Sequence, residues 1–204
     1  MGATDGNNRV ICYDRLNFND DGTIQPVKML VQDNFDDNNM FGWNTFGGSF
    51  VASGQSLQAS QAEGAKALLD TDFGDLTVSV EITHNTPSES DADAGLIFRA
   101  SNPKEGVDSF RGYYAGIKLT GEVVLWKMND TTALQLGRNN LNVSAGTSYR
   151  LQVIASGEDI KVFVDDLDTA LISVKDGTHV SGMDGVRVFK TAATFDNFKL
   201  QAEA

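Results

Sequence analysis

Residues 94–129 alternate between apolar and polar side chains, and this period of two is typical of β-strands. Two strands are expected at 95–100 and 113–119, separated by a polar loop, and Gly121 turns the chain into a third at 123–128. One face of these strands is apolar, which predicts a protein core. The other face carries cationic, phenolic and indole groups: Arg99, Tyr114, Lys118 and Trp126. Such a face suits a polar, hydroxyl-rich ligand, although an ordinary solvated sheet surface has the same pattern.

The rest of the chain continues this pattern, which predicts an all-β fold. Further strands are expected at 46–52, 67–69, 76–84, 148–156, 159–164, 170–174, 185–189 and 193–201. Turn residues separate them, and no segment keeps helical periodicity for long. Many short strands at this spacing are typical of a sandwich or barrel. We predict that residues 31–204 form two antiparallel sheets packed face to face, a β-sandwich.

The expected interior consists of apolar residues that repeat at every second position of these strands. A sheet that buries only one face requires this repeat. The residues are Val78, Val80, Ile82, Leu96, Phe98, Leu151, Val153, Val162 and Val164.

The composition excludes several classes of partner. The chain of 204 residues carries a formal net charge of −12, which argues against nucleic acid and anionic membranes because phosphate contacts need clustered lysine and arginine. No apolar run approaches the ~20 residues of a membrane-spanning helix. The first residues, MGATDGNNR, are no signal peptide. Cys12 is the only cysteine, so no internal disulfide can form.

Catalytic machinery is not evident in the sequence. Nucleophilic catalysis needs an activated serine or cysteine beside a base, and neither histidine belongs to such a motif. Glu89, Asp91 and Asp93 form the obvious acidic cluster, which we interpret as a solvated loop before a strand. Glu81 is the one carboxylate in mid-strand on the polar face, whereas glycoside hydrolysis needs a pair. We predict that the chain is not an enzyme.

Six motifs follow one another across residues 33–200: DNFDDNNMFGWNTFGGSFVASGQSL (33–57), AGLIFRA (94–100), GYYAGIKLTGEVVLWK (112–127), YRLQVIASGEDIKVFVDD (149–166), SGMDGVRVF (181–189) and FDNFKL (195–200). In order and spacing they resemble carbohydrate-binding module family 66 and the related laminin-G-like domains. These are lectin-like, concanavalin-like jelly rolls. The resemblance implies that Trp43 is a core anchor rather than a ligand platform, because Gly-Trp opens the first strand of such modules.

Residues 9–27, RVICYDRLNFNDDGTIQPV, separately resemble the C-terminal end of a propeller glycosidase of glycoside hydrolase family 43. We therefore expect residues 1–30 to be the remnant of an upstream catalytic domain and residues 31–204 to be its accessory module. Together the resemblances imply a non-catalytic carbohydrate-binding module of a secreted, plant-polysaccharide-degrading glycosidase. It would recognise terminal sugars of fructan, arabinan or arabinoxylan, with the propeller as a second partner. The alternative is a purely structural domain that packs on the propeller and binds no ligand.

Eight residues are expected to bind the sugar: Glu81, Arg99, Glu105, Asp108, Arg111, Tyr114, Lys118 and Trp126. If their strands are neighbours, Glu81 would hold Arg99 as a preorganised donor for vicinal hydroxyls. The loop 101–111 would close over a terminal sugar. Trp126 shares a face with two apolar neighbours, so a core position and a ligand platform both stay open. The alternative for Glu81 and Arg99 is an ordinary cross-strand ion pair.

A structural calcium ion, which would join the first and last strands, is also implied by the resemblance. Its candidate ligands are Asp33 and Asp36 in DNFDD and Asp196 in FDNF. Calcium prefers ~6–8 oxygen ligands, and backbone carbonyls of nearby turns would supply the others. The alternative is that these acids cap turns at a solvated edge.

Overall fold

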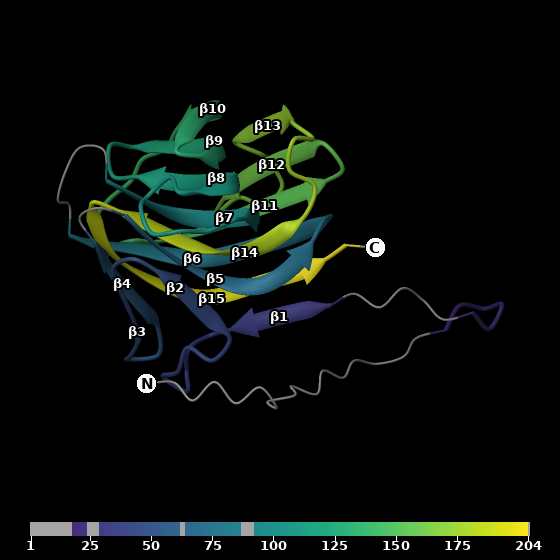
Figure 1. Ribbon diagram of the computed structural model, residues 1–204, viewed down its shortest axis with the longest axis horizontal. Coiled ribbons are helices and arrows are strands. Elements are labelled where there is room, and N and C mark those ends of the chain that lie inside the picture. The colour runs from purple at the N-terminus through teal and green to yellow at the C-terminus, as the bar shows by residue number, and fades with distance from the viewer. Residues whose placement is uncertain (1–17, 24–28, 62–63, 87–91, 204) are drawn as a thin grey trace.

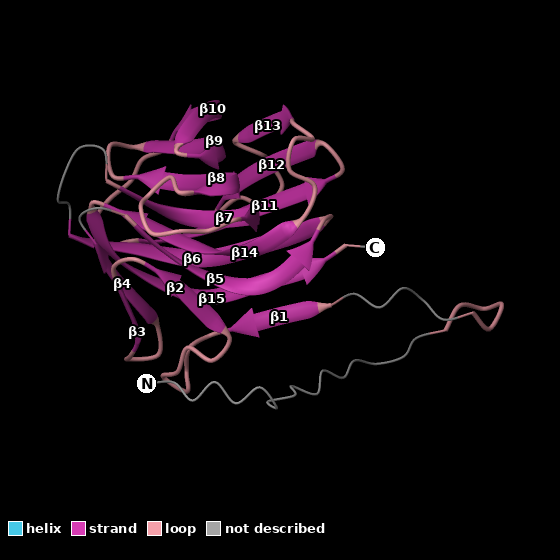
Figure 2. Ribbon diagram, viewed as in Figure 1, coloured by secondary structure: helices cyan, strands magenta, loops and turns pink. Residues whose placement is uncertain are grey.

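Residues 18–23, 29–61, 64–86 and 92–203 are described by a computed structural model of the chain. Two antiparallel sheets pack face to face, so the expected all-β sandwich is confirmed (Figure 1). Strands are the only regular elements in these residues (Figure 2). The described residues contain no helix that is long and apolar enough to cross a membrane. Most of the expected N-terminal remnant lies outside the described residues, and that domain boundary stays a prediction.

One sheet has eight strands. Its order is β13 (Ile172–Lys175), β12 (Asp159–Val164), β11 (Ser148–Ser156), β6 (Leu76–Thr86), β15 (Thr191–Ala202), β4 (Leu57–Gln61) and β3 (Ser49–Ala52), and β1 (Leu30–Asp33) also pairs with β15. The other sheet has seven strands. Its order is β10 (Thr132–Asn140), β9 (Glu122–Asp130), β8 (Phe110–Lys118), β7 (Asp93–Ser101), β14 (Gly182–Phe189), β5 (Ala65–Phe73) and β2 (Trp43–Phe46).

The core lies between the two sheets, where each strand places its apolar face. All nine residues expected in the interior are buried there. Trp43 belongs to the same core: its ring centroid lies 5.8 Å from that of Phe35 and 5.0 Å from that of Phe198. Its indole Nε1 donates a hydrogen bond to Asp33 Oδ2 at 2.8 Å. The expectation that Trp43 is a core anchor is therefore confirmed.

Strand alternation locates most strands, but it fails at the sheet edges. β11 and β12 have the expected bounds, whereas β1, β4 and β10 were not expected. In β10 no residue is fully buried, because the strand lies at an edge, and only Leu136 packs against the core. The expected strand 46–52 is wrong: Gly47 and Gly48 have positive φ and separate β2 from β3, which belong to different sheets.

The seven-stranded sheet has a second, smaller apolar cluster on its outer face, which points away from the sandwich interior. Its buried members are Leu68, Ile97, Ala100, Phe110, Tyr114 and Met128. Trp126 packs against this cluster and is partly exposed. Side chains on this outer face are therefore held in place by packing, as a binding surface requires.

The first and last strands of the sandwich lie side by side. β1 pairs antiparallel with β15, in a register that runs from Leu30 opposite Gln201 to Asp33 opposite Phe198. The beginning of β1 and the end of β15 therefore lie at the same end of the sandwich (Figure 1).

Candidate functional site

A row of outward-facing residues crosses the middle of the seven-stranded sheet. The strand register places Lys66, Arg187, Gly95, Gly116 and Val124 side by side in that order, on β5, β14, β7, β8 and β9. Two adjacent glycines leave the centre of this row without side chains. The row therefore opens a trough on the outer face of the sheet.

The phenol ring of Tyr114 lies in this trough. A Cβ atom at position 116 would collide with the Tyr114 ring and hydroxyl, so glycine at 116 lets the ring lie along the sheet. The Arg187 guanidinium lies over that ring, 4.0 Å from its centroid, in a cation–π contact. The Tyr114 hydroxyl donates a hydrogen bond to Asp93 Oδ1 at 2.8 Å. These contacts fix the three polar side chains before any ligand arrives.

Arg187 is almost completely buried, with 6% of its side chain exposed. Its terminal nitrogens face two carboxylates, Asp93 Oδ1 at 3.4 Å and Asp108 Oδ1 at 3.5 Å. Its Nε has no hydrogen-bond partner among the described residues. A buried donor without a partner costs ~1–3 kcal/mol. The guanidinium is therefore held in place at some cost in stability, and its Nε is closed to solvent.

A pocket of about 190 Å³ lies over Arg187 and is called the outer-face pocket below. Its polar and aromatic lining consists of Asp93, Asp108, Lys118, Trp126, Arg187 and Phe189. Burial raises the pKa of Asp93, and the nearby charge of Arg187 and the hydrogen bond from Tyr114 oppose this rise. Burial also raises the pKa of Tyr114 well above its ordinary value. The pocket thus combines carboxylates, cations and aromatic rings.

Four of the residues expected to bind a ligand meet at this pocket. Asp108, Lys118 and Trp126 line it, and Tyr114 lies beneath Arg187. Trp126 lies on the outer face rather than in the sandwich core, and its role as a ligand platform stays a prediction. Two other expected residues are not part of the lining. Glu105 is exposed on the β7–β8 loop, and Arg111 donates two hydrogen bonds to Oδ2 of the partly exposed Asp130.

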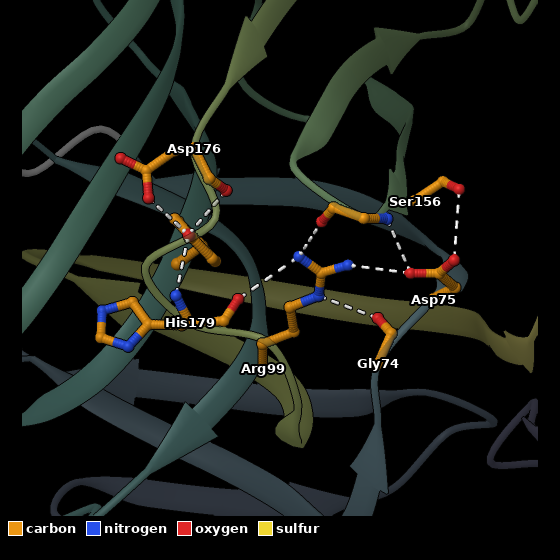
Figure 3. A network of polar contacts seen from close by, with 8 residues as sticks. Gly74, Asp75, Arg99, Ser156, Asp176 and His179 are labelled. Carbon is orange, nitrogen blue, oxygen red and sulfur yellow. Dashed lines mark hydrogen bonds and ion pairs between the residues drawn. The ribbon is translucent and has the colours of Figure 1, made fainter.

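The expected place of Arg99 on a ligand-binding face is wrong, because a β-bulge interrupts β7. The register with β8 shifts between Phe98 and Ser101, and Arg99 has a φ of +51°. The side chain leaves the outer face and is 1% exposed. It donates to the carbonyl oxygens of Gly74 at 2.8 Å and Gly157 at 2.9 Å (Figure 3). Arg99 is therefore a structural cross-link between loops.

The expected pairing of Glu81 with Arg99 is also wrong, because their strands belong to different sheets. Glu81 lies on β6, opposite Arg150 of β11 and Asp196 of β15. There it lines a larger polar hollow of about 570 Å³, together with Arg150 and Lys199. Aromatic rings that could stack on a sugar are not presented by the described residues around this hollow, since Phe198 is buried in the core. The outer-face pocket is therefore the better candidate.

Three of the polar and aromatic lining residues were missed in the sequence: Asp93, Arg187 and Phe189. Arg187 and Phe189 lie on β14, whose inward residues include Val186 and Val188, so alternation places both on the outer face. The sequence does not show, however, that β14 lies next to β7. The interpretation of the acidic cluster as a solvated loop is wrong for Asp93, because this residue is the first of β7 and only 5% exposed. The other two acids of that cluster, Glu89 and Asp91, lie outside the described residues.

The candidate calcium ligands lie at the end of β1, in the turn that follows it and on β15, at Asp33, Asp36 and Asp196. Among the described residues, no three acidic, histidine or cysteine side chains are placed to hold a metal ion. Asp33 accepts hydrogen bonds from the Phe35 amide at 2.9 Å and from the Trp43 indole at 2.8 Å, so it fixes the turn after β1. Burial raises the pKa of Asp196, and the negative charges of Glu81 and Asp36 add to this rise. The calcium site of Asp33, Asp36 and Asp196 stays a prediction.

Comparisons with solved structures place the sandwich among lectin-like folds. The carbohydrate-binding module CBM66 from Bacillus subtilis is similar with a TM-score of 0.70 and 23% identity, over 79% of this chain and 96% of that one. The VIP36 exoplasmic/lumenal domain in its Ca²⁺/Man3GlcNAc-bound form has a TM-score of 0.64 and 12% identity, over 85% and 88%. A putative glycosyl hydrolase from Parabacteroides distasonis has a TM-score of 0.62 and 10% identity, over 83% and 92%. The resemblance to family 66 is thus confirmed for the fold.

The sequence also matches one family directly. No curated protein matches the chain. The family described as the 3-keto-alpha-glucoside-1,2-lyase-like domain matches residues 31–201, which is nearly the whole sandwich. The chain therefore belongs to the family of 3-keto-alpha-glucoside-1,2-lyase-like domains.

Proposed function

We propose that the chain binds the terminal sugar of an oligo- or polysaccharide in the outer-face pocket, as the non-catalytic module of a secreted polysaccharide-degrading glycosidase. The observation that carries this proposal is Arg187. Its guanidinium is buried against Tyr114 and lies between Asp93 and Asp108, and the residue lines the pocket. A donor fixed beside two acceptors suits vicinal hydroxyl groups, which both donate and accept hydrogen bonds.

The shape of the outer-face pocket favours one sugar ring at a chain end. Its volume of about 190 Å³ is below the ~300 Å³ at which pockets for drug-sized ligands begin. Trp126 and Phe189 offer aromatic surface for the apolar face of a sugar ring. Two solved structures of similar fold support a sugar as ligand: CBM66 is a carbohydrate-binding module, and VIP36 was solved with Man3GlcNAc.

Trp126→Ala tests this proposal by calorimetric titration with oligosaccharides from fructan, arabinan and arabinoxylan. We expect the wild type to bind one of them and the variant to bind it at least about tenfold more weakly, because loss of an aromatic hot-spot residue costs ~2 kcal/mol or more. Arg111→Ala is the matched control, since Arg111 is exposed and paired with Asp130 away from the pocket lining. We expect this control to bind like the wild type. Equal affinity of Trp126→Ala and the wild type would exclude the pocket as the sugar site.

The alternative of a purely structural domain gives a different result in the same titrations. It predicts that no sugar binds and that the chain binds tightly to a separated propeller catalytic domain. Binding of both sugar and propeller would show a module with two partners.

A second candidate function is an elimination reaction on an oxidised sugar, which the family description names. Asp93 favours it, because burial raises the pKa of this carboxyl and Arg187 and Lys118 lie beside it at the pocket. A keto group at C3 makes the hydrogen on C2 acidic. A carboxylate would take this proton while the C1–O bond breaks and a C1=C2 double bond forms, and the leaving oxygen is then protonated. The cations would stabilise the enolate oxygen.

Incubation with a 3-keto-α-glucoside, followed by NMR, separates the two functions. For a binding module we expect the leaving group to be released no faster than in buffer. Faster release that Asp93→Asn abolishes would establish the elimination and contradict a purely binding role.

A further inference from the structure

One wall of the outer-face pocket is a loop rather than a strand. Residues 102–109 connect β7 to β8, and their Val107 and Asp108 line the pocket. The loop makes few backbone hydrogen bonds of its own: Lys104 N donates to Ser109 O, and Ser109 N donates to Gly106 O. Phe110 N also donates to Asp108 O. Contacts from outside the loop add to these: Asn102 donates to Asp130 at 3.0 Å, and Asp108 lies 3.5 Å from Arg187.

Lys66 supplies a further contact from the neighbouring strand β5. Its side chain is fully buried, and its ammonium donates to the carbonyl oxygens of Lys104 at 2.8 Å and Gly106 at 2.5 Å. The same ammonium lies 5.6 Å from the centroid of the Phe110 ring, in the first residue of β8. One side chain thus fixes two carbonyls in the middle of the loop and packs on the residue where the loop ends.

The charges around Lys66 show that this ammonium is costly to bury. Arg187 is its register neighbour on β14, and no described carboxylate lies within ion-pair distance of the Lys66 ammonium. Asp108 attracts it from the loop, but burial and the charge of Arg187 lower the pKa of Lys66 to about 8. The side chain is therefore still charged at neutral pH, and backbone carbonyls rather than carboxylates solvate it. Both hydrogen bonds of this buried cation go to carbonyl oxygens of the loop, so the cation restrains the position of the loop backbone.

We propose that Lys66 is a positioning residue of the outer-face pocket: it fixes the β7–β8 loop so that Asp108 and Val107 close over the sugar beside Arg187. This inference rests on the proposed function, because the pocket is the site that Lys66 would shape. Lys66 itself does not line the pocket, so it acts through the loop.

The test is Lys66→Met, which keeps the length of the side chain but removes its donors. We expect hydrogen exchange at the amides of Lys104 and Ser109 to become at least about tenfold faster, with β9 unchanged, because a lost anchor opens the loop locally. We expect sugar affinity to fall at least about tenfold as well, since an unfixed wall must be ordered on binding. Arg138→Met is the matched control, as Arg138 lies further along the same row and is 67% exposed.

The exchange measurement needs no sugar, so it separates this inference from the proposed function. Unchanged loop exchange in Lys66→Met would overturn the role of Lys66, whether or not any sugar binds. Faster loop exchange with unchanged affinity would overturn its role in the pocket alone. Absence of sugar binding by the wild type would instead contradict the proposed function. Should Lys66→Met fail to fold, Lys66→Gln makes the same comparison with an uncharged, shorter side chain, and Lys66→Arg should restore slow exchange.

Discussion

Replacing Arg99 with alanine is expected to destabilise the protein by about 2–4 kcal/mol, because more than one hydrogen-bond acceptor loses the donor of a buried side chain. The guanidinium joins three loops: it donates to carbonyls of Gly74, Gly157 and His179 and contacts Asp75 at 3.4 Å (Figure 3). Asp75 in turn accepts a hydrogen bond from the Gly157 amide at 2.7 Å. Without Arg99, several acceptors lose their donor, and each one left buried costs ~1–3 kcal/mol.

Urea unfolding of Arg99→Ala, compared with Arg138→Ala, measures this effect. Arg138 is an arginine of β10 with 67% of its side chain exposed, and its removal should change the free energy of unfolding little. A loss below about 1 kcal/mol for Arg99→Ala would contradict the structural role. Arg99→Lys keeps the charge but not the planar fork of donors, so we expect it to recover only part of the loss. If Arg99→Ala does not fold, the lysine variant still shows a lower midpoint than the wild type.

The wild type is expected to become less stable as the pH rises towards neutrality, and replacing Asp184 with asparagine is expected to abolish this decrease. Asp184 is fully buried on β14. It accepts hydrogen bonds from the Thr71 hydroxyl at 2.8 Å and from the Arg99 amide at 3.1 Å. Burial nevertheless raises its pKa from the ordinary 3.8 to about 7. The folded protein therefore holds this proton more tightly than the unfolded chain does.

The direction of the pH effect follows from these two pKa values. The stability that the raised pKa contributes is fully present below about pH 4 and is lost as the pH rises through about 7, by up to ~4 kcal/mol. Asparagine does not titrate, so the stability of Asp184→Asn should rise relative to the wild type across this interval, apart from a constant offset. Urea unfolding of both proteins from about pH 4 to about pH 8 measures the difference. Parallel curves would show that Asp184 keeps an ordinary pKa in the folded protein.

The sandwich and its core could be predicted because burial of one strand face leaves a local trace in the sequence. Val78, Val80 and Ile82 show this, since alternation alone places them inside. Arg99 shows where the method fails. A single residue with positive φ changes which face the following side chains occupy, and strand alternation contains no sign of such a bulge.

The candidate site was harder to predict, because it depends on which strands are neighbours. Tyr114 and Lys118 lie on β8 and Trp126 lies on the next strand, β9, so their meeting follows from one hairpin. Arg187 reaches the same pocket only because β14 inserts between β5 and β7, about 90 residues away from β7 along the chain. Glu81 lies on the opposite sheet for the same kind of reason. Long-range strand order leaves no periodic trace in the sequence.

The pairing of β1 with β15 determines how the sandwich responds to mechanical load. Leu30 and Gln201 lie opposite each other at the start of that antiparallel ladder. A force that pulls the two ends of the sandwich apart therefore acts across a single pair of residues, perpendicular to the strands. The ladder hydrogen bonds then break one after another, as in unzipping, instead of sharing the load as they would in shear. Under tension β1 is the strand that peels away first, while the outer-face pocket lies on the other sheet and stays intact.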